Sequence, residues 1–499
     1  MRTSLQAAMA AINLYSEYFL GLIVSLTIAR NLSTEDYGLY SSIIWIAGLI
    51  TLAINSGLAI NVTKFVAEFT KKDNGELPGI LAYFWRIQHI RIAIVVVLAI
   101  TILGFQYGQT KMELWLLVIL FLCAVVKADY MFRMAIFKGI KKYDVLAKTS
   151  LITNPFNIVA VLTCALFSPK LEYFVLIYCG TCLMYGASAR LFNKNLPKSS
   201  WQNNTVKQHK DRIIAQMLSA TGIVFLSALI FKQSQVVFLE HNNLLSEAGF
   251  FNIAFLLSTA AITLIPGIYQ EILLPKITDA VQNNDVNAQV AQAEKYLMAL
   301  SLLVVAPMIF YADVIIEILY GQRYQGAVLP LQVMIVLKTI LTLNQGANLT
   351  LISYDKQVGM LKIKAFLFLC ALIISLISVP LWGLKGALLT YGTLTLLSLV
   401  LYSHLAKQCG YKMISIRIMY RISLAAVIAS IPMLLLDQLL NGLLSAIIGT
   451  LIYVVVYLNL LFVTKGYDRS VGYLLKQIRP KLPQYCHSYL SWAIKRLVS

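Results

Sequence analysis

Charged side chains are scarce in this chain. Only 13% of its 499 residues are Asp, Glu, Lys or Arg, about half the share of a typical soluble protein, whereas 59% are hydrophobic. This composition excludes an ordinary soluble domain and predicts repeated spans of about 20 apolar residues. Because lipid offers the backbone no hydrogen-bond partners, such spans must be helices or a closed barrel. Runs such as 92–103 and 443–463 lack the alternation of barrel strands, so we expect an all-α polytopic membrane protein.

Motifs for nucleotide hydrolysis and metal binding are also missing. The sequence contains no Gly-x4-Gly-Lys-Ser/Thr loop and no Asp-x-Asp, and its 5 histidines are scattered without metal spacing. Its 7 cysteines include Cys179 and Cys182, which we interpret as small apolar packing residues. We therefore expect a protein that is not an enzyme, with no catalytic residue, metal or cofactor. The net charge is +19. Because the basic residues lie in loops beside membrane helices, we expect them to attract anionic lipid headgroups rather than nucleic acid.

The distribution of basic residues predicts the orientation of about 14 transmembrane helices. With the N-terminus inside, nearly all of the 41 Lys and Arg residues fall in inner segments. The predicted outer loops hold only Arg30, Lys111, Lys170, Arg323 and Lys385. This asymmetry fits the positive-inside rule for a multi-pass chain with both termini in the cytoplasm.

A short internal repeat predicts two pseudo-symmetric lobes. Residues 36–40 read acidic–x–Gly–apolar–aromatic, and residues 247–251 repeat the pattern six predicted spans later. An even number of spans gives both copies the same orientation, as in the parallel repeats of transporters. We predict a six-helix lobe at 1–190, a basic cytoplasmic linker at 191–212 and a second six-helix lobe at 213–405. Two extra helices at 406–465 and a basic amphipathic cytoplasmic tail at 466–499 complete the prediction.

Two loop motifs resemble those of a known family. Residues 29–38, ARNLSTEDYG, resemble the A-R-x-L-x-x-x-x-[YF]-G signature after the first helix of polysaccharide flippases. Residues 321–327, GQRYQGA, resemble their G-x-x-Y-x-x-A element before the tenth helix. Ser33 stands where Gly is common in that family. We interpret Gly38 as permitting a tight approach or a positive φ at a helix start. The whole chain resembles the Wzx-type lipid-linked oligosaccharide flippases of the multidrug/oligosaccharidyl-lipid/polysaccharide exporter superfamily.

That resemblance implies a function and a set of partners. The expected activity is translocation of an undecaprenyl-diphosphate-linked oligosaccharide from the cytoplasmic to the periplasmic leaflet of the bacterial inner membrane, for O-antigen, lipopolysaccharide or another surface polysaccharide. Expected partners are this substrate, membrane lipids, a polysaccharide polymerase and a chain-length regulator, with coupling to a proton or sodium gradient. The alternatives are a cation-coupled multidrug antiporter, which needs acidic residues in its cavity, and a membrane polysaccharide polymerase, which typically has a large basic periplasmic loop.

Lysines within predicted spans are the first candidates for the substrate site. A charge at the centre of a span is costly and usually faces a cavity or a partner. Lys338 shares one helix face with Thr342 and Gln345, at i+4 and i+7, and we favour it as the receptor for the diphosphate. An intramembrane salt bridge is the alternative. Lys232, with Gln235 one turn away, either lines the same cavity or reaches the interface.

Other polar residues within spans receive structural interpretations. Lys127 lies near the cytoplasmic end of its span, and we interpret it as a snorkelling residue. Asn154 and Asn157 flank Pro155, which favours a proline kink over a ligand site.

Acidic residues within spans are the candidates for ion coupling. Glu17 shares a helix face with Asn13, Gly21 and Ser25, and this face is predicted to line a path, to bind a cation or proton, or to pair with a buried lysine. Close helix packing with Glu17 paired is the alternative. Asp129 and Arg133, at i and i+4, predict a local ion pair.

Overall fold

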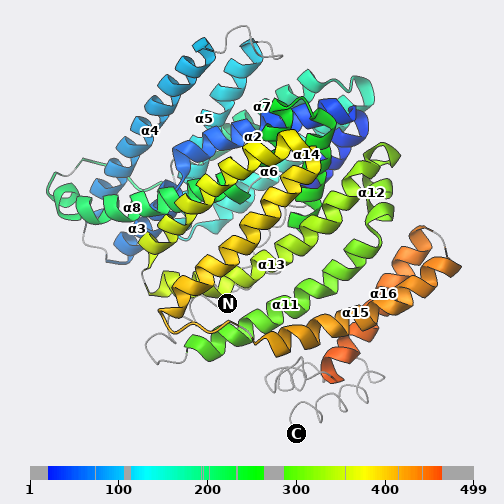
Figure 1. Cartoon of the computed structure of the whole chain (residues 1–499). Helices are drawn as coiled ribbons and strands as arrows, with labels where there is room; N and C mark the ends of the chain where they lie inside the picture. The colour runs from blue at the N-terminus through cyan, green and yellow to red at the C-terminus, as the bar shows by residue number, and fades with distance from the viewer. Residues whose placement is uncertain are drawn as a thin grey trace, which may run out of the picture. The chain divides into compact units, whose positions relative to one another are not determined.

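The computed structural model is a helical protein (Figure 1). It describes residues 21–72, 75–105, 114–192, 194, 196–201, 203–231, 234–262, 286–354, 356–413, 415–440 and 442–463. Within these ranges the structure is all-helical and contains no strand, which confirms the predicted fold class. In the same ranges 10 helices are long and apolar enough to cross a membrane, or up to 11 when a bent pair counts as one span.

Contacts divide the chain into two compact units. The first, from residues 1–256 and 357–394, contains α2 (Thr34–Asn55), α3 (Leu58–Lys72), α4 (Leu77–Phe105), α5 (Leu114–Gly139), α6 (Tyr143–Phe167), α7 (Leu171–Leu191), α8 (Asn203–Phe231) and α9 (Ser234–His241). The second, from residues 257–356 and 395–499, contains α11 (Val286–Phe310), α12 (Ala312–Tyr320), η2 (Gln322–Ala327), α13 (Val328–Ser353), α15 (Ile416–Leu439) and α16 (Leu443–Val463). Helix α14 (Gln357–Lys407) contributes to both units, and the predicted lobe boundaries stay a prediction.

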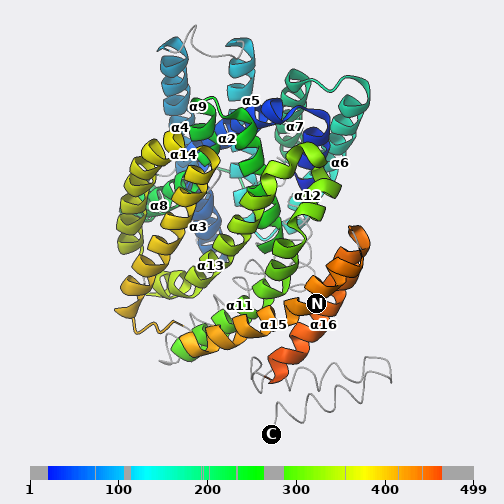
Figure 2. The same ribbon diagram turned by 45° about the vertical axis from the view of Figure 1, so that its right-hand side comes forward.

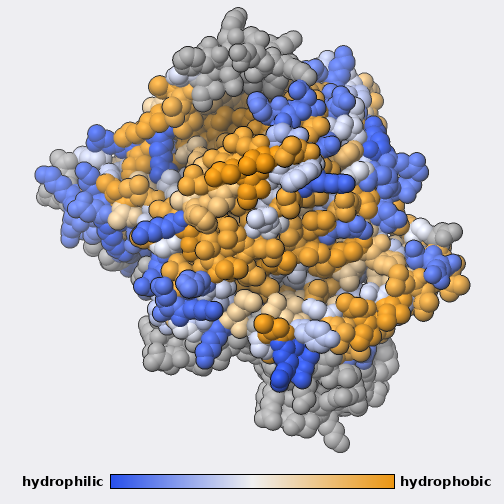
Figure 3. Space-filling model, in the orientation of Figure 1, coloured by the Kyte–Doolittle hydropathy of each residue, from blue (hydrophilic) through white to orange (hydrophobic). Residues whose placement is uncertain are grey.

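The apolar runs 363–381 and 385–404, which the sequence predicts as two separate spans, lie in the single long helix α14. Its 51 residues are broken at Gly383, where φ is 53° and ψ is −128°. At 1.5 Å per residue α14 is about 76 Å long, which is enough for two crossings of a 30 Å hydrocarbon core. Ile373 and Leu376 on its surface are 60% and 63% exposed, and Figure 3 shows a hydrophobic surface where α14 lies. Such exposed apolar side chains suit contact with lipid.

Two other spans differ from their predicted extent. Helix α8 begins at Asn203, within the segment predicted as a linker. The predicted span 296–319 is bent by 75° between Glu294–Phe310 and Ala312–Tyr320. Pro307 removes one helical hydrogen bond just before this bend, and the residue at the break, Tyr311, is buried. In the same unit α15 and α16 pack side by side (Figure 2).

The two copies of the repeated motif contact each other inside the first unit. A Cβ atom placed on Gly38 would lie 1.9 Å from the carbonyl oxygen of Leu245 and 3.2 Å from the amide nitrogen of Gly249. The hydroxyl oxygens of Thr34 and Ser246, at the starts of the two helices, are 2.9 Å apart. Gly38 therefore serves the tight approach of two backbones, one of the two roles considered for it.

Polar side chains reinforce this contact. Ser33 caps α2 by accepting a hydrogen bond from the amide of Asp36 at 3.0 Å. Asn252, on the helix at Leu245–Ile262, donates to Tyr37 Oη at 3.1 Å and to Ser41 Oγ at 2.6 Å. These buried hydrogen bonds tie α2 to the second motif copy.

Candidate functional site

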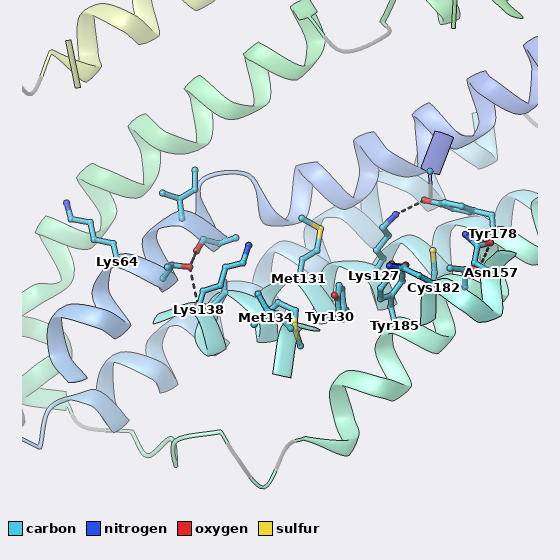
Figure 4. A pocket seen from close by; sticks show the side chains of 18 residues that line it. Lys64, Lys127, Tyr130, Met131, Met134, Lys138, Asn157, Tyr178, Cys182 and Tyr185 are labelled. Carbon is cyan, nitrogen blue, oxygen red and sulfur yellow. Dashed lines mark hydrogen bonds between the residues drawn. The ribbon is translucent and has the colours of Figure 1, made fainter. Parts of the chain in front are cut away.

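A cavity of about 800 Å³ lies within the first unit, between α3, α5, α6 and α7 (Figure 4). Its lining mixes lysines, tyrosines, amides and apolar side chains. The lining residues are Gly21, Ala59, Ile60, Thr63, Lys64, Lys127, Tyr130, Met131, Met134, Ala135, Lys138, Leu146, Asn154, Asn157, Tyr178, Thr181, Cys182 and Tyr185.

Helix α5 runs along the whole cavity. Lys127, Met131, Met134 and Lys138 recur at helical spacing, so they form one stripe that faces the cavity. Eleven residues separate the two lysines, which is a rise of about 16 Å along the helix. Figure 4 shows Lys64 and Lys138 at one end and Lys127 near Tyr178 at the other. The cavity therefore has two cationic ends with an apolar stretch between them.

Lys127 occupies the end of the cavity nearer the start of α5. Its ammonium nitrogen donates to Tyr178 Oη at 3.5 Å and lies 5.1 Å from the centroid of the Tyr178 ring. The interpretation of Lys127 as a snorkelling residue is therefore wrong. Helical side chains tilt toward the N-terminus of their helix, which directs Lys127 away from the Gly139 end of α5 and toward α7.

Lys64 and Lys138 occupy the opposite end and are both exposed. Lys64 Nζ donates to Gln216 Oε1 at 3.0 Å, which links α3 to α8. The two positive charges make this end of the cavity a suitable first contact for an anionic group.

A break between α2 and α3 sets the direction of the helix that carries Lys64. Gly57 has a φ of 67°, in the left-handed region that favours glycine, and a Cβ there would lie 2.3 Å from the amide nitrogen of Thr221. Arg91 donates to the carbonyl oxygens of Ile54 and Ser56 at 3.2 and 2.8 Å and to Thr221 Oγ1 at 2.9 Å. Its guanidinium thus satisfies carbonyls freed by the break.

Paired amides and rings form the wall opposite α5. Tyr185 Oη donates to Asn154 Oδ1 at 2.6 Å, and the hydroxyl of Thr181 lies 3.1 Å from Asn157 Oδ1. The ring of Tyr185 packs against the ring of Tyr130 on α5, with centroids 4.7 Å apart. Pro155 lies inside α6 as expected, yet Asn154 and Asn157 line the cavity rather than serving only a kink.

The electrostatics of the cavity are one-sided. Among its described lining residues three are lysines and none is acidic. The nearby Asp129 pairs with Arg133 at 2.9 Å, which confirms the predicted ion pair, and lies 3.9 Å from Arg190. The cavity can therefore hold an anion together with groups that form hydrogen bonds or stack on rings.

The structure places Lys338 in the second unit. Lys338 is buried and donates to Thr259 Oγ1 at 2.5 Å. Thr342 is also buried and donates to the carbonyl oxygen of Thr339 at 2.7 Å, and Gln345 is half-buried. All three predicted residues share a face of α13, because this helix continues unbroken from Val328 to Ser353. Their role in substrate binding stays a prediction.

Of the other predicted site residues the structure describes only Gln235, which does not line the cavity. Gln235, on α9, is buried and donates to Ser375 Oγ at 3.0 Å, so it joins two helices of the first unit. Lys232, Glu17 and Asn13 lie outside the described residues.

Sequence reasoning missed the residues that line the cavity. Lys64 and Lys138 were counted with the cytoplasmic loops, and Lys127 was treated alone. A usable signal was present: Lys127, Met131, Met134 and Lys138 repeat at intervals of four, three and four, which defines one face of a helix. Nothing in the sequence showed which helices that face would meet.

Comparisons with known proteins identify a family and similar folds. The family model described as "Polysaccharide biosynthesis protein" matches residues 7–281. Among solved structures, the chain is similar to the lipid II flippase MurJ in an inward closed conformation, with 16% identity and a TM-score of 0.68 over 91% of this chain and 98% of that chain. It is also similar to an inward-facing multidrug resistance MATE family transporter of the MOP superfamily, with 13% identity and a TM-score of 0.62 over 81% of this chain and 99% of that one.

A MOP superfamily transporter from Pyrococcus furiosus is a third similar structure, with 14% identity and a TM-score of 0.55 over 82% of this chain and 95% of that one. Comparison with curated proteins finds no match. At such identities the likeness concerns the fold, so the chain has the fold of MurJ and MATE transporters.

Proposed function

The chain belongs to the polysaccharide biosynthesis protein family, and from this premise we propose that it is a flippase for a polyprenyl-diphosphate-linked oligosaccharide. The substrate would move from the cytoplasmic to the periplasmic leaflet of the bacterial inner membrane and would serve O-antigen or another surface polysaccharide. The single observation that carries the proposal is the cavity of the first unit, with three lysines and no acidic residue among its described lining residues.

The cavity chemistry matches the two parts of such a headgroup. An ammonium group beside low-dielectric walls attracts a diphosphate more strongly than it would in water. Tyrosine rings and amide groups offer the stacking and hydrogen-bonding surfaces that sugars require. The lipid tail would stay in the bilayer, because only the headgroup needs a polar path.

The two cationic ends support a two-step passage. Lys127 and Lys138 are about 16 Å apart along α5, too far for one diphosphate to contact both. The exposed Lys64 and Lys138 would load the headgroup, and Lys127 would then hold it deeper. Rearrangement of the helices around the cavity would then open it alternately to each side of the membrane.

A cation-coupled multidrug antiporter is the alternative favoured by the likeness to MATE transporters. Such an antiporter needs carboxylates where its cationic substrate binds, and the described lining of this cavity has none. In the proposed flippase, Lys338 of the second unit would either take part in coupling to a proton or sodium gradient or provide a second contact for the anionic headgroup.

The test uses purified protein in liposomes that contain a fluorescent polyprenyl-diphosphate oligosaccharide. We expect the wild type to expose the probe to an external quencher. Lys127→Ala should weaken binding of farnesyl diphosphate at least about tenfold, the value of one charge-assisted hydrogen bond. Lys148→Ala is the matched control, because Lys148 is exposed, lies 3.4 Å from Asp144 and does not line the cavity.

Two outcomes would refute the flippase. One is a wild type that moves no lipid-linked oligosaccharide but exports a cationic dye. The other is a Lys127→Ala variant with wild-type affinity and wild-type rate of flipping.

A further inference from the structure

Asn154 presents an amide nitrogen to the cavity with no partner. Its side chain is buried, at 7% exposure, and lines the cavity. Its oxygen accepts the hydroxyl proton of Tyr185 at 2.6 Å, which fixes the orientation of the amide. Within the described residues that hydrogen bond engages the oxygen of the amide and leaves its nitrogen without an acceptor. Because Asn154 lines the cavity, this nitrogen is available to donate to a ligand.

Asn157 presents the complementary group. Thr181 has a single hydroxyl proton, yet its oxygen lies 2.8 Å from the carbonyl oxygen of Ile177 and 3.1 Å from Asn157 Oδ1. The nearer carbonyl takes the proton, as is usual for a threonine inside a helix. Hydrogen bonding then favours the turned amide, in which Asn157 Nδ2 donates to Thr181 Oγ1 and Oδ1 faces the cavity. Asn157 therefore supplies an acceptor.

We propose that Asn154 and Asn157 form a subsite for the acetamido group of the sugar attached to the diphosphate. This inference rests on the proposed flippase function and names the sugar class that the cavity selects. Residues at i and i+3 are neighbours on one helix face, about 5–6 Å apart at Cβ. The acetamido carbonyl would accept from Asn154 Nδ2, and the acetamido N–H would donate to Asn157 Oδ1.

The polarity of the pair favours an acetamido group over any other single substituent. A carboxylate offers only acceptors and an ammonium only donors, so each would leave one of the two asparagines unsatisfied. A sugar hydroxyl rotates and can contact either amide, but one oxygen does not bridge both. An acetamido group carries one acceptor and one donor on opposite edges of a rigid plane. The rings of Tyr130 and Tyr185 offer an apolar surface for its methyl group.

Lys127 lies at the correct place for the neighbouring diphosphate. It contacts Tyr178, and Asn157 contacts Thr181, three residues further along α7. Positions i and i+3 adjoin on a helix surface. Figure 4 shows Lys127, Asn157, Tyr178 and Tyr185 gathered at one end of the cavity. A diphosphate at Lys127 therefore places its first sugar against the two asparagines.

The experiment compares three synthetic probes on the purified full chain: farnesyl diphosphate, farnesyl-diphospho-glucose and farnesyl-diphospho-N-acetylglucosamine. We expect the acetamido probe to bind about tenfold more tightly than the glucose probe, because it gains two neutral hydrogen bonds. Asn154→Leu and Asn157→Leu should each bring this ratio close to one. Thr181→Val, which removes only the group that orients Asn157, should lower the ratio by a smaller factor.

Asn459→Leu on α16 is the matched control, because Asn459 donates to a backbone carbonyl of its own helix and does not line the cavity. It should keep the wild-type ratio. Equal affinity of the wild type for the two sugar probes would overturn the acetamido subsite and leave the flippase intact, and this result needs no variant. Failure of the wild type to bind any diphosphate probe would instead overturn the proposed function.

Discussion

Gly38→Ala tests the contact between the two motif copies. The added Cβ would lie 1.9 Å from the carbonyl oxygen of Leu245 and 2.8 Å from its carbonyl carbon. Both atoms belong to the backbone, so no rotamer change relieves the clash and the two helices must separate. We expect Gly38→Ala to disfavour the conformation in which these helix starts touch.

The size of the effect follows from two opposing terms. Overpacking of a close contact costs about 1–3 kcal/mol, and replacing a helical glycine by alanine returns up to about 1 kcal/mol. Gly48→Ala, on the same helix, separates these terms, because a Cβ at Gly48 meets nothing within 4 Å. The two variants should therefore differ by about 1–3 kcal/mol in the stability of the closed contact.

A cysteine pair reports this contact directly. Thr34 and Ser246 have hydroxyl oxygens 2.9 Å apart, so Thr34→Cys with Ser246→Cys should form a disulfide on mild oxidation in a background without other cysteines. Gly38→Ala should reduce the yield, and Gly48→Ala should not. Equal yields and equal unfolding temperatures for both glycine variants would refute the backbone clash.

Three further predictions concern single side chains. Arg91→Met should lower the free energy of unfolding by about 2–3 kcal/mol in denaturant titrations, because the carbonyls of Ile54 and Ser56 lose a charged donor; an unchanged midpoint would contradict this. Tyr411→Phe should destabilise the second unit by about 1–3 kcal/mol, since the buried Glu294 carboxylate loses the hydroxyl that donates to it; thermal unfolding in detergent measures the loss, with Tyr420→Phe on the exposed face of α15 as control. Lys338→Ala should insert normally yet lose glycan export, and normal surface polysaccharide in that strain would exclude a transport role for Lys338.

The sequence was sufficient for the fold class because one physical rule dominates it. Lipid forces backbone groups to pair within a helix, so apolar runs predict helices directly. The contact of Gly38 with the second motif copy was not predictable. Composition identified a glycine at a helix start, but only the three-dimensional arrangement shows that a backbone carbonyl passes 1.9 Å from its missing Cβ.

The site was harder to predict because burial and partnership are properties of several helices together. The ammonium group of a lysine near the end of a span can lie at the membrane interface or in a cavity. That of Lys127 lies in the cavity, because its side chain tilts toward α7. Similarly, Asn154 and Asn157 next to a proline suggested a kink, yet Tyr185 and Thr181 on another helix orient them. Pairings between helices decide these roles, and a single sequence does not reveal them.

The separation of the two cationic ends has a kinetic consequence. Exposed charges are screened within about 8 Å at physiological ionic strength, whereas a partly enclosed ammonium is screened much less. Salt should therefore slow capture of the headgroup by Lys64 and Lys138, and should change its residence time beside Lys127 far less. Association and dissociation rates measured across a salt series would separate the encounter of the lipid with the protein from its retention.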